Sequence, residues 1–170
     1  MTHARARAAV GWLSGLIVGA LALAEPTCAA DGGWREPLQR AQIALAGGDA
    51  RGAELAWQDA YRAAMRVRTP EALLDVGRAY VRIGEAAHDR QTAVAWARRL
   101  FLEAFVQARE RRDAEALAGV GEAFAALGDH HVALRAFDAA LALATQPRDA
   151  AARDRIAALR ALSDYATRTP

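Results

Sequence analysis

The sequence predicts an all-α protein made of three helix-turn-helix repeats followed by a C-terminal capping helix. Its 170 residues include 46 alanines but only nine valines and four isoleucines, a composition that favours helices over sheets. A series of glycine, alanine and aromatic residues also recurs along the chain at spacings typical of packed helices. A chain of this length is sufficient for one domain with a sizeable core.

Residues 1–30 are expected to be a signal peptide. Arg5 and Arg7 precede the uncharged run 8–24, which is shorter than the about 20 apolar residues that a membrane-spanning helix needs. Small residues favour cleavage after Ala30, which predicts a periplasmic or secreted protein. Cleavage there also removes Cys28, the only cysteine, and with it any disulfide. An uncleaved anchor, which would bring the protein to a membrane, and a lipoprotein at Cys28 remain open as alternatives.

The first and third repeats are related by a shift of eighty residues. Their matching positions are Ala41, Gly48, Ala53, Trp57 and Ala60 in the first and Gly121, Gly128, Ala133, Phe137 and Ala140 in the third. Alanine and glycine allow two antiparallel helices to approach closely, and the aromatic residue fills the space between layers. The spacing therefore predicts the same helical hairpin twice.

The middle repeat agrees with the first in two separate parts. Gly77, Tyr80 and Gly84 follow their first-repeat counterparts by 36 residues, whereas Ala97, Phe101 and Ala104 follow theirs by 44. We therefore expect an eight-residue insertion between Gly84 and Ala97. The repeats then occupy about 34–67, 70–110 and 114–147 of a single domain over 31–170.

Turn and cap residues predict where the helices begin and end. Glycine adopts the positive φ that often ends a helix, so the turns inside the repeats are expected at Gly48, Gly84 and Gly128. Thr69 and Asp113 are N-cap residue types ahead of the second and third repeats. Asp89 is the expected cap of a lengthened second helix that begins near Arg90.

The last predicted element is a capping helix over 149–167, which Asp149 begins. We expect its apolar residues to lie on one side and to cover the exposed end of the stack: Ile156, Leu159, Leu162 and Tyr165.

These residues resemble the tetratricopeptide repeat family. The match is strongest over 114–147, through Val120 and Gly121, Phe124, the turn Gly128 and Asp129, and then Ala133, Phe137 and Ala140. The middle repeat matches through Val76, Gly77, Tyr80 and Gly84 before the insertion and Ala97, Phe101 and Ala104 after it. The resemblance covers about 34–147. It implies a right-handed solenoid whose first helices line a groove for a peptide or a helix of a partner protein.

Helical geometry identifies the residues opposite the packed stripe, which would face that groove. They are Leu38, Gln42 and Leu45 in the first repeat, Glu71, Leu74, Arg78, Val81 and Arg82 in the second, and Glu115 and Glu122 in the third. Leu38, Leu74 and Val81 are expected to give apolar contact, and Arg78 and Arg82 to orient an acidic or C-terminal carboxylate group. The alternative is a solvated helix face, where alternating charge is ordinary.

Trp96 lies on the expected insertion and has two interpretations. Tryptophan is enriched in the energetically dominant contacts of interfaces, so a protruding helix tip that carries Trp96 is a possible partner contact. The alternative is that Trp96 packs against the neighbouring first helix.

Composition and motifs exclude several function classes. The formal charge is only +2, so no nucleic acid partner is expected. Neither a phosphate-binding loop nor an HExxH motif is present, and we expect no enzyme activity and no cofactor. His88, His130 and His131 are not spaced to share a metal, so no metal site is expected.

The sequence thus predicts an exported scaffold or adaptor that holds a segment of a partner protein and supports assembly of an envelope complex. Two alternatives remain open. One is an accessory factor that delivers a metal or cofactor to an exported enzyme with those three histidines, and the other is a self-assembling structural protein.

Overall fold

The computed structural model describes residues 33–146 and 149–168, and all regular structure in these ranges is helical. The helices are α1 (Arg35–Ala46), α2 (Ala50–Val67), α3 (Pro70–Ala86), α4 (Arg90–Glu110), α5 (Ala114–Ala126), α6 (His130–Leu143) and α7 (Ala150–Arg168). The predicted all-α class is confirmed for this part of the chain.

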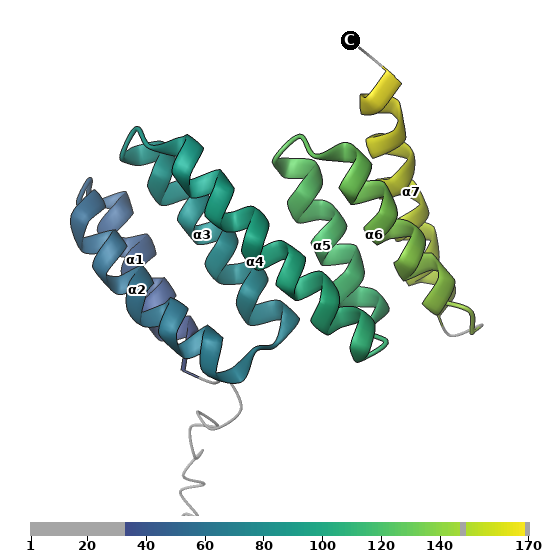
Figure 1. Ribbon diagram of the computed structural model, residues 1–170, viewed down its shortest axis with the longest axis horizontal. Coiled ribbons are helices and arrows are strands. Elements are labelled where there is room, and N and C mark those ends of the chain that lie inside the picture. The colour runs from purple at the N-terminus through teal and green to yellow at the C-terminus, as the bar shows by residue number, and fades with distance from the viewer. Residues whose placement is uncertain (1–32, 147–148, 169–170) are drawn as a thin grey trace, which may run out of the picture.

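Six helices form three antiparallel pairs, α1 with α2, α3 with α4, and α5 with α6, which stand in a row (Figure 1). Each pair packs on the next, since α2 contacts α3 and α4 contacts α5, and α7 packs on α6 at the C-terminal end. Helix α3 also contacts α1 and α5. The first helices of the pairs therefore form one layer, and α2, α4 and α6 form the other.

The predicted helix starts at Thr69, Asp89 and Asp113 are confirmed. Their side chains accept hydrogen bonds from the backbone N–H groups of Ala72 (3.3 Å), Thr92 (3.4 Å) and Ala116 (2.9 Å), respectively. Such a cap satisfies one of the donors that the first turn of a helix leaves unpaired.

Close packing inside the pairs depends on the glycines that the repeat singled out. A Cβ atom at Gly77 would lie 2.5 Å from Cε1 of Phe101, and one at Gly121 would lie 2.5 Å from Cε1 of Phe137. Phe101 and Phe137 are each only 1% exposed. The aromatic ring therefore occupies the space that the glycine leaves, as the sequence predicted.

An aromatic stack joins the first pair to the second. The Trp57 ring stacks on Tyr80, with ring centroids 4.1 Å apart, and its indole Nε1–H donates to the Val76 carbonyl at 2.9 Å. Tyr80 is half-buried. Burial raises the pKa of its hydroxyl above 10.0, and the nearby carboxylates of Glu54 and Asp89 raise it further.

The prediction that Gly84 forms the middle turn is wrong. Gly84 is buried inside α3, where an added Cβ would lie 2.2 Å from the Ala93 Cβ. The turn occupies 87–89, and its residue with positive φ is His88, at 58°. The three turns therefore lie at positions 48, 88 and 128, forty residues apart. The eight extra residues are shared as about one helical turn in each arm, because an antiparallel pair keeps its register only when both arms lengthen equally.

The expected apolar side of α7 is correct only in its first half. Ile156 is fully buried and Leu159 is half-buried, but Leu162 and Tyr165 are 67% and 70% exposed. Residues three apart on an α-helix drift by about 60° per step, so a series of three such steps ends on the opposite side. Ser163, seven residues after Ile156, occupies the buried side instead.

Candidate binding groove

Two hollows lie along the layer of first helices, one on each side of α3. The first, of about 340 Å³, is bordered by α1 and α3. The second, of about 250 Å³, reaches from α3 to the end of α5 and to the start of α4. Arg78 and Arg82 line both hollows, because residues four apart share one side of a helix. The structure thus brings the two predicted groove arginines to one place.

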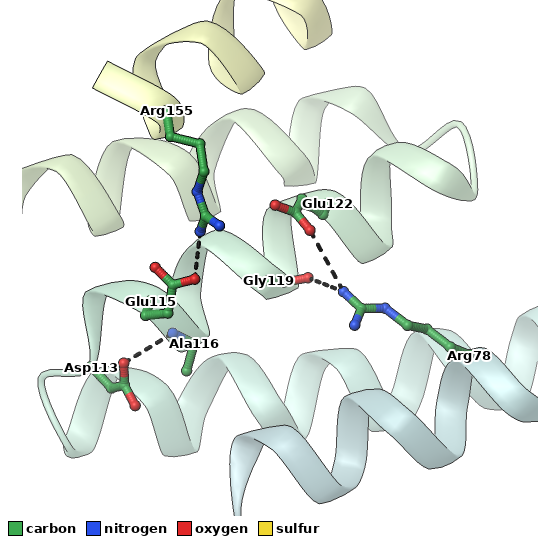
Figure 2. A network of polar contacts seen from close by, with 7 residues as sticks. All are labelled: Arg78, Asp113, Glu115, Ala116, Gly119, Glu122 and Arg155. Atoms are coloured by element: carbon green, nitrogen blue, oxygen red, sulfur yellow. Dashed lines mark hydrogen bonds and ion pairs between the residues drawn. The ribbon is translucent and has the colours of Figure 1, made fainter. Parts of the chain in front are cut away.

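Arg78 is held against α5. Its Nη2 donates to the Gly119 carbonyl at 3.0 Å and lies 4.0 Å from Oε2 of Glu122 (Figure 2). Because Gly119 has no side chain, the Arg78 guanidinium can approach the Gly119 carbonyl. Arg78 therefore helps to join the second pair to the third, and much of its hydrogen-bonding capacity is directed at the protein itself.

Arg82 differs from Arg78 because its guanidinium is uncommitted. It is exposed, and it forms no hydrogen bond or ion pair with any residue of the described ranges. An arginine presents several N–H donors in a planar fork that suits a carboxylate. Of the two groove arginines, Arg82 is the one that has donors available for an incoming anion.

The predicted apolar contacts are less accessible than expected. Leu74 is 4% exposed, and its Cδ1 lies against Gly119 of α5, so it joins the pairs and is removed from the expected contact surface. Leu38 is 6% exposed and borders the first hollow together with the exposed Gln42. Val81 is half-buried beside the second hollow.

The remaining predicted groove residues do not converge on the hollows. Leu45 is half-buried against the core, and Glu71 is exposed at the start of α3, outside both linings. Glu115 accepts a hydrogen bond from Arg155 of α7 at 2.5 Å (Figure 2). The third repeat therefore uses its predicted groove carboxylates, Glu115 and Glu122, in contacts between helices.

Asp75 is a lining residue that the sequence analysis missed. Its carboxylate borders the first hollow and accepts a hydrogen bond from the buried Trp34 indole at 3.3 Å. The signal was its position four residues after Glu71 and three before Arg78, which places it on the same side of α3. The hollow thus carries both signs of charge.

Trp96 lies on α4 and contacts α2, the second helix of the first pair. The two interpretations from the sequence were a free helix tip and a contact with a neighbouring first helix. Its ring meets Tyr61 of α2 edge to face, with centroids 6.3 Å apart, and Arg99 lies 5.6 Å from its centroid. The side chain keeps 39% of its surface exposed. Trp96 therefore contributes to packing between pairs and still leaves one side open.

The three histidines are not brought together as a metal site. His88 occupies the exposed α3–α4 turn, and His130 and His131 begin α6. His130 keeps a buried Nδ1 atom that has no hydrogen-bond partner within the described ranges. Those ranges contain no group of three His, Cys, Asp or Glu side chains close enough to hold an ion.

The predicted signal peptide and its cleavage position lie outside the described residues. Among the helices of the described ranges, none combines the length and the apolar character that crossing a membrane requires. Compared with protein-family models and with curated proteins, the chain matches none.

Proposed function

We propose that this protein is an exported scaffold or adaptor that holds a segment of a partner protein along α1, α3 and α5, and that it supports the assembly of an envelope complex. The observation that carries the proposal is Arg82, an exposed and uncommitted guanidinium that borders two adjacent hollows. We further propose that the three helix pairs are tetratricopeptide-like repeats in a right-handed solenoid. The recurring contact of glycine with phenylalanine inside the second and third pairs supports that assignment.

The proposed mechanism assigns different roles to the two arginines. Arg78 contacts Gly119 and Glu122 and stabilises the packing of α3 against α5. Arg82 binds a carboxylate of the partner through paired N–H donors, while Leu38 and Val81 give a small apolar contact beside it. The partner segment would therefore carry an acidic side chain or a C-terminal carboxylate next to an apolar residue.

The experiment that tests this proposal is affinity capture from an envelope extract of the host, with the bound proteins identified by mass spectrometry. Wild type is compared with Arg82→Glu and with Arg66→Glu, a charge reversal of an exposed arginine on α2 that borders neither hollow. We expect one partner to be retained by wild type and Arg66→Glu and lost with Arg82→Glu. Equal recovery with all three proteins would show that Arg82 is only solvated.

Export is tested separately by N-terminal sequencing of the protein isolated from its host. We expect the mature chain to begin at Asp31. A chain that begins at Met1 and stays with the membrane fraction would instead support the uncleaved anchor.

A further inference from the structure

A third hollow lies on the opposite side of the molecule from the groove, between the second helices α4 and α6. Its volume is about 510 Å³, and its border carries three arginines, Arg109, Arg112 and Arg135, and no aspartate or glutamate. Its remaining border is apolar, from Phe105, Leu117, Ala139, Ala142 and Leu143. Three like charges around an apolar floor are an arrangement that needs an explanation.

These three guanidiniums are not neutralised by their surroundings. None of them forms a hydrogen bond or ion pair with any residue of 33–146 or 149–168. Arg109 is held over the face of Phe105, 5.7 Å from the ring centroid. The nearby carboxylate of Asp138 is engaged by Arg160 of α7 at 2.5 Å. The hollow therefore presents a local excess of positive charge.

The corresponding junction between the first and second pairs shows how such charge is normally neutralised. Arg68 follows α2 with φ 48°, just as Arg112 follows α4 with φ 54°. Arg68 donates to Glu103 of α4 at 2.6 Å. Phe101 and Phe137 occupy the same place in their pairs, so the counterpart of Glu103, two residues further on, is Ala139. The carboxylate that neutralises Arg68 is thus replaced by an alanine on the border of the third hollow.

Two other exchanges increase the contrast. The counterpart of Arg109 in the first junction is Met65, and the counterpart of Val132 there is Trp96, which packs on Tyr61. The second junction has therefore gained a guanidinium and lost both a carboxylate and a large ring.

We propose that the hollow between α4 and α6 is a second docking surface, which binds an acidic amphipathic segment of a partner protein. Arginine forks suit carboxylates, and the apolar floor suits neighbouring leucine or phenylalanine side chains. The hollow is partly open to solvent, so it would bury less of a small ligand than ordinary small-molecule sites do. A segment anchored elsewhere by its own protein does not need that enclosure.

The surrounding charge argues against broad anionic partners. Glu110 borders a neighbouring hollow together with Arg109, and Glu115 and Asp149 border another neighbouring hollow together with Arg112. A flat anionic membrane or a long nucleic acid would meet these carboxylates together with the arginines, and like charges would repel. A short acidic segment fits between them.

The test measures binding of a fluorescein-labelled 14-residue peptide, with leucine and glutamate at helical spacing, by fluorescence anisotropy. The protein is used in the form isolated from its host. The salt concentration is about 50 mM, where interactions between surface charges are screened less than at physiological salt. We expect saturable binding that weakens about tenfold in Arg135→Gln, because a charge-assisted contact of this kind is worth about one decade in affinity. Ala139→Glu, which restores the carboxylate of the first junction, is expected to abolish measurable binding.

The controls separate this surface from the groove and from general electrostatics. Arg99→Gln, the counterpart of Arg135 in the first junction, is expected to leave peptide affinity unchanged. All variants are compared in an Arg82→Glu background, so that the groove arginine does not contribute to peptide binding. A peptide with lysine in place of glutamate should not bind.

The proposal is overturned if binding of the glutamate peptide fails to saturate, if Arg99→Gln and Arg135→Gln weaken its binding equally, or if the lysine peptide binds as well. Tighter binding of anionic phospholipid vesicles or of an oligonucleotide, with the same dependence on Arg135, would also overturn it. If Ala139→Glu does not fold, Arg135→Gln decides the outcome.

Discussion

The second and third helix pairs share the same contact between their two helices, although their helices differ in length. In both, a phenylalanine fills the space over a glycine, Phe101 over Gly77 and Phe137 over Gly121. Helices α3 and α4 have 17 and 21 residues, whereas α5 and α6 have 13 and 14. The added residues extend both arms beyond the glycine–phenylalanine contact. The glycine–phenylalanine contact therefore sets the register of the two helices in a pair. The lengths of these helices can vary at the end next to the turn.

The turns of the two pairs show what that extension changes. The N–H of the aspartate before the second helix donates back to the end of the first helix in both pairs, at 2.8 Å from Asp89 to Gly84 and 2.9 Å from Asp129 to Phe124. The residue before it is His88 in one pair and Gly128 in the other. Asp89 caps its own helix, whereas the Asp129 carboxylate accepts two hydrogen bonds from Arg98, at 2.6 and 2.8 Å. The backbone hydrogen bond at the turn is thus the same in both pairs, whereas the two aspartate side chains bind different groups.

The largest expected effect is loss of the shared aromatic contact. Phe101→Ala and Phe137→Ala should each lower the free energy of unfolding by about 3–5 kcal/mol, because both rings are buried and a cavity remains. Phe101 also meets Phe124 edge to face at 5.7 Å, so its loss should cost about 0.5–1.5 kcal/mol more. Chemical denaturation monitored by circular dichroism measures both. A small effect for either variant would contradict the shared register.

The next effect distinguishes a packed glycine from a turn glycine. Gly84→Ala should destabilise the protein by about 1–3 kcal/mol, because its Cβ would overlap the Ala93 Cβ and approach the Asp89 carbonyl oxygen at 3.0 Å. Adding Ala93→Gly should recover part of that loss in a double-mutant cycle. Gly128→Ala meets no atom within 4 Å and is penalised only through its φ of +82°, by about 1–2 kcal/mol. Recovery of Gly128→Ala by Ala93→Gly would refute the steric account.

Replacing the turn residue His88 by glycine should raise the stability, whereas the glycine substitutions above should lower it. His88→Gly should stabilise the protein by about 1 kcal/mol, because glycine adopts positive φ without a steric penalty. For a domain of this size that corresponds to a rise in Tm of roughly 2–4 °C. Thermal unfolding of the single variant is sufficient as the measurement. A lower Tm would mean that the His88 side chain has a stabilising contact of its own.

The smallest effect is a dependence of stability on alkaline pH. The folded state raises the pKa of Tyr80 mainly by burial, so it favours the protonated hydroxyl. Stability from this group is therefore complete below the unfolded pKa near 10 and is lost as pH rises through the higher folded pKa. The chain contains no lysine, so few other groups titrate in that range. Denaturation midpoints between pH 9 and about 11 should fall less steeply in Tyr80→Phe than in wild type, and parallel slopes would exclude the effect.

Local sequence was a good guide to helix starts and a poor guide to the middle turn. Thr69, Asp89 and Asp113 cap the helices that follow them, because capping depends on a few neighbouring residues. Gly84 was expected at a turn by analogy with Gly48 and Gly128. Instead, the helix continues through it, since the partner arm supplies Ala93 to pack against it. A glycine in a sequence does not reveal whether it is needed for its φ or for its missing side chain.

The candidate sites show the same division. Helical periodicity placed Arg78 and Arg82 on one side of α3, and both border the hollows there. Periodicity could not show that Leu74 would be covered by α5 or that Glu115 would pair with Arg155. Those outcomes depend on which helix stands beside each residue. The arginines between α4 and α6 were missed for the same reason, because they come from two helices and from the junction that follows α4.

The sequence by itself therefore determined the all-α class, the helix caps and the glycine–phenylalanine contacts within pairs. Each of these depends on residues that are close in the chain or related by a simple period. Only the tertiary structure decided the position of the middle turn, the exposed end of α7 and which charges remain without a partner. These depend on contacts between residues far apart in sequence, since a guanidinium is neutralised, as at Arg68, or left open, as at Arg112, by the helix that packs beside it.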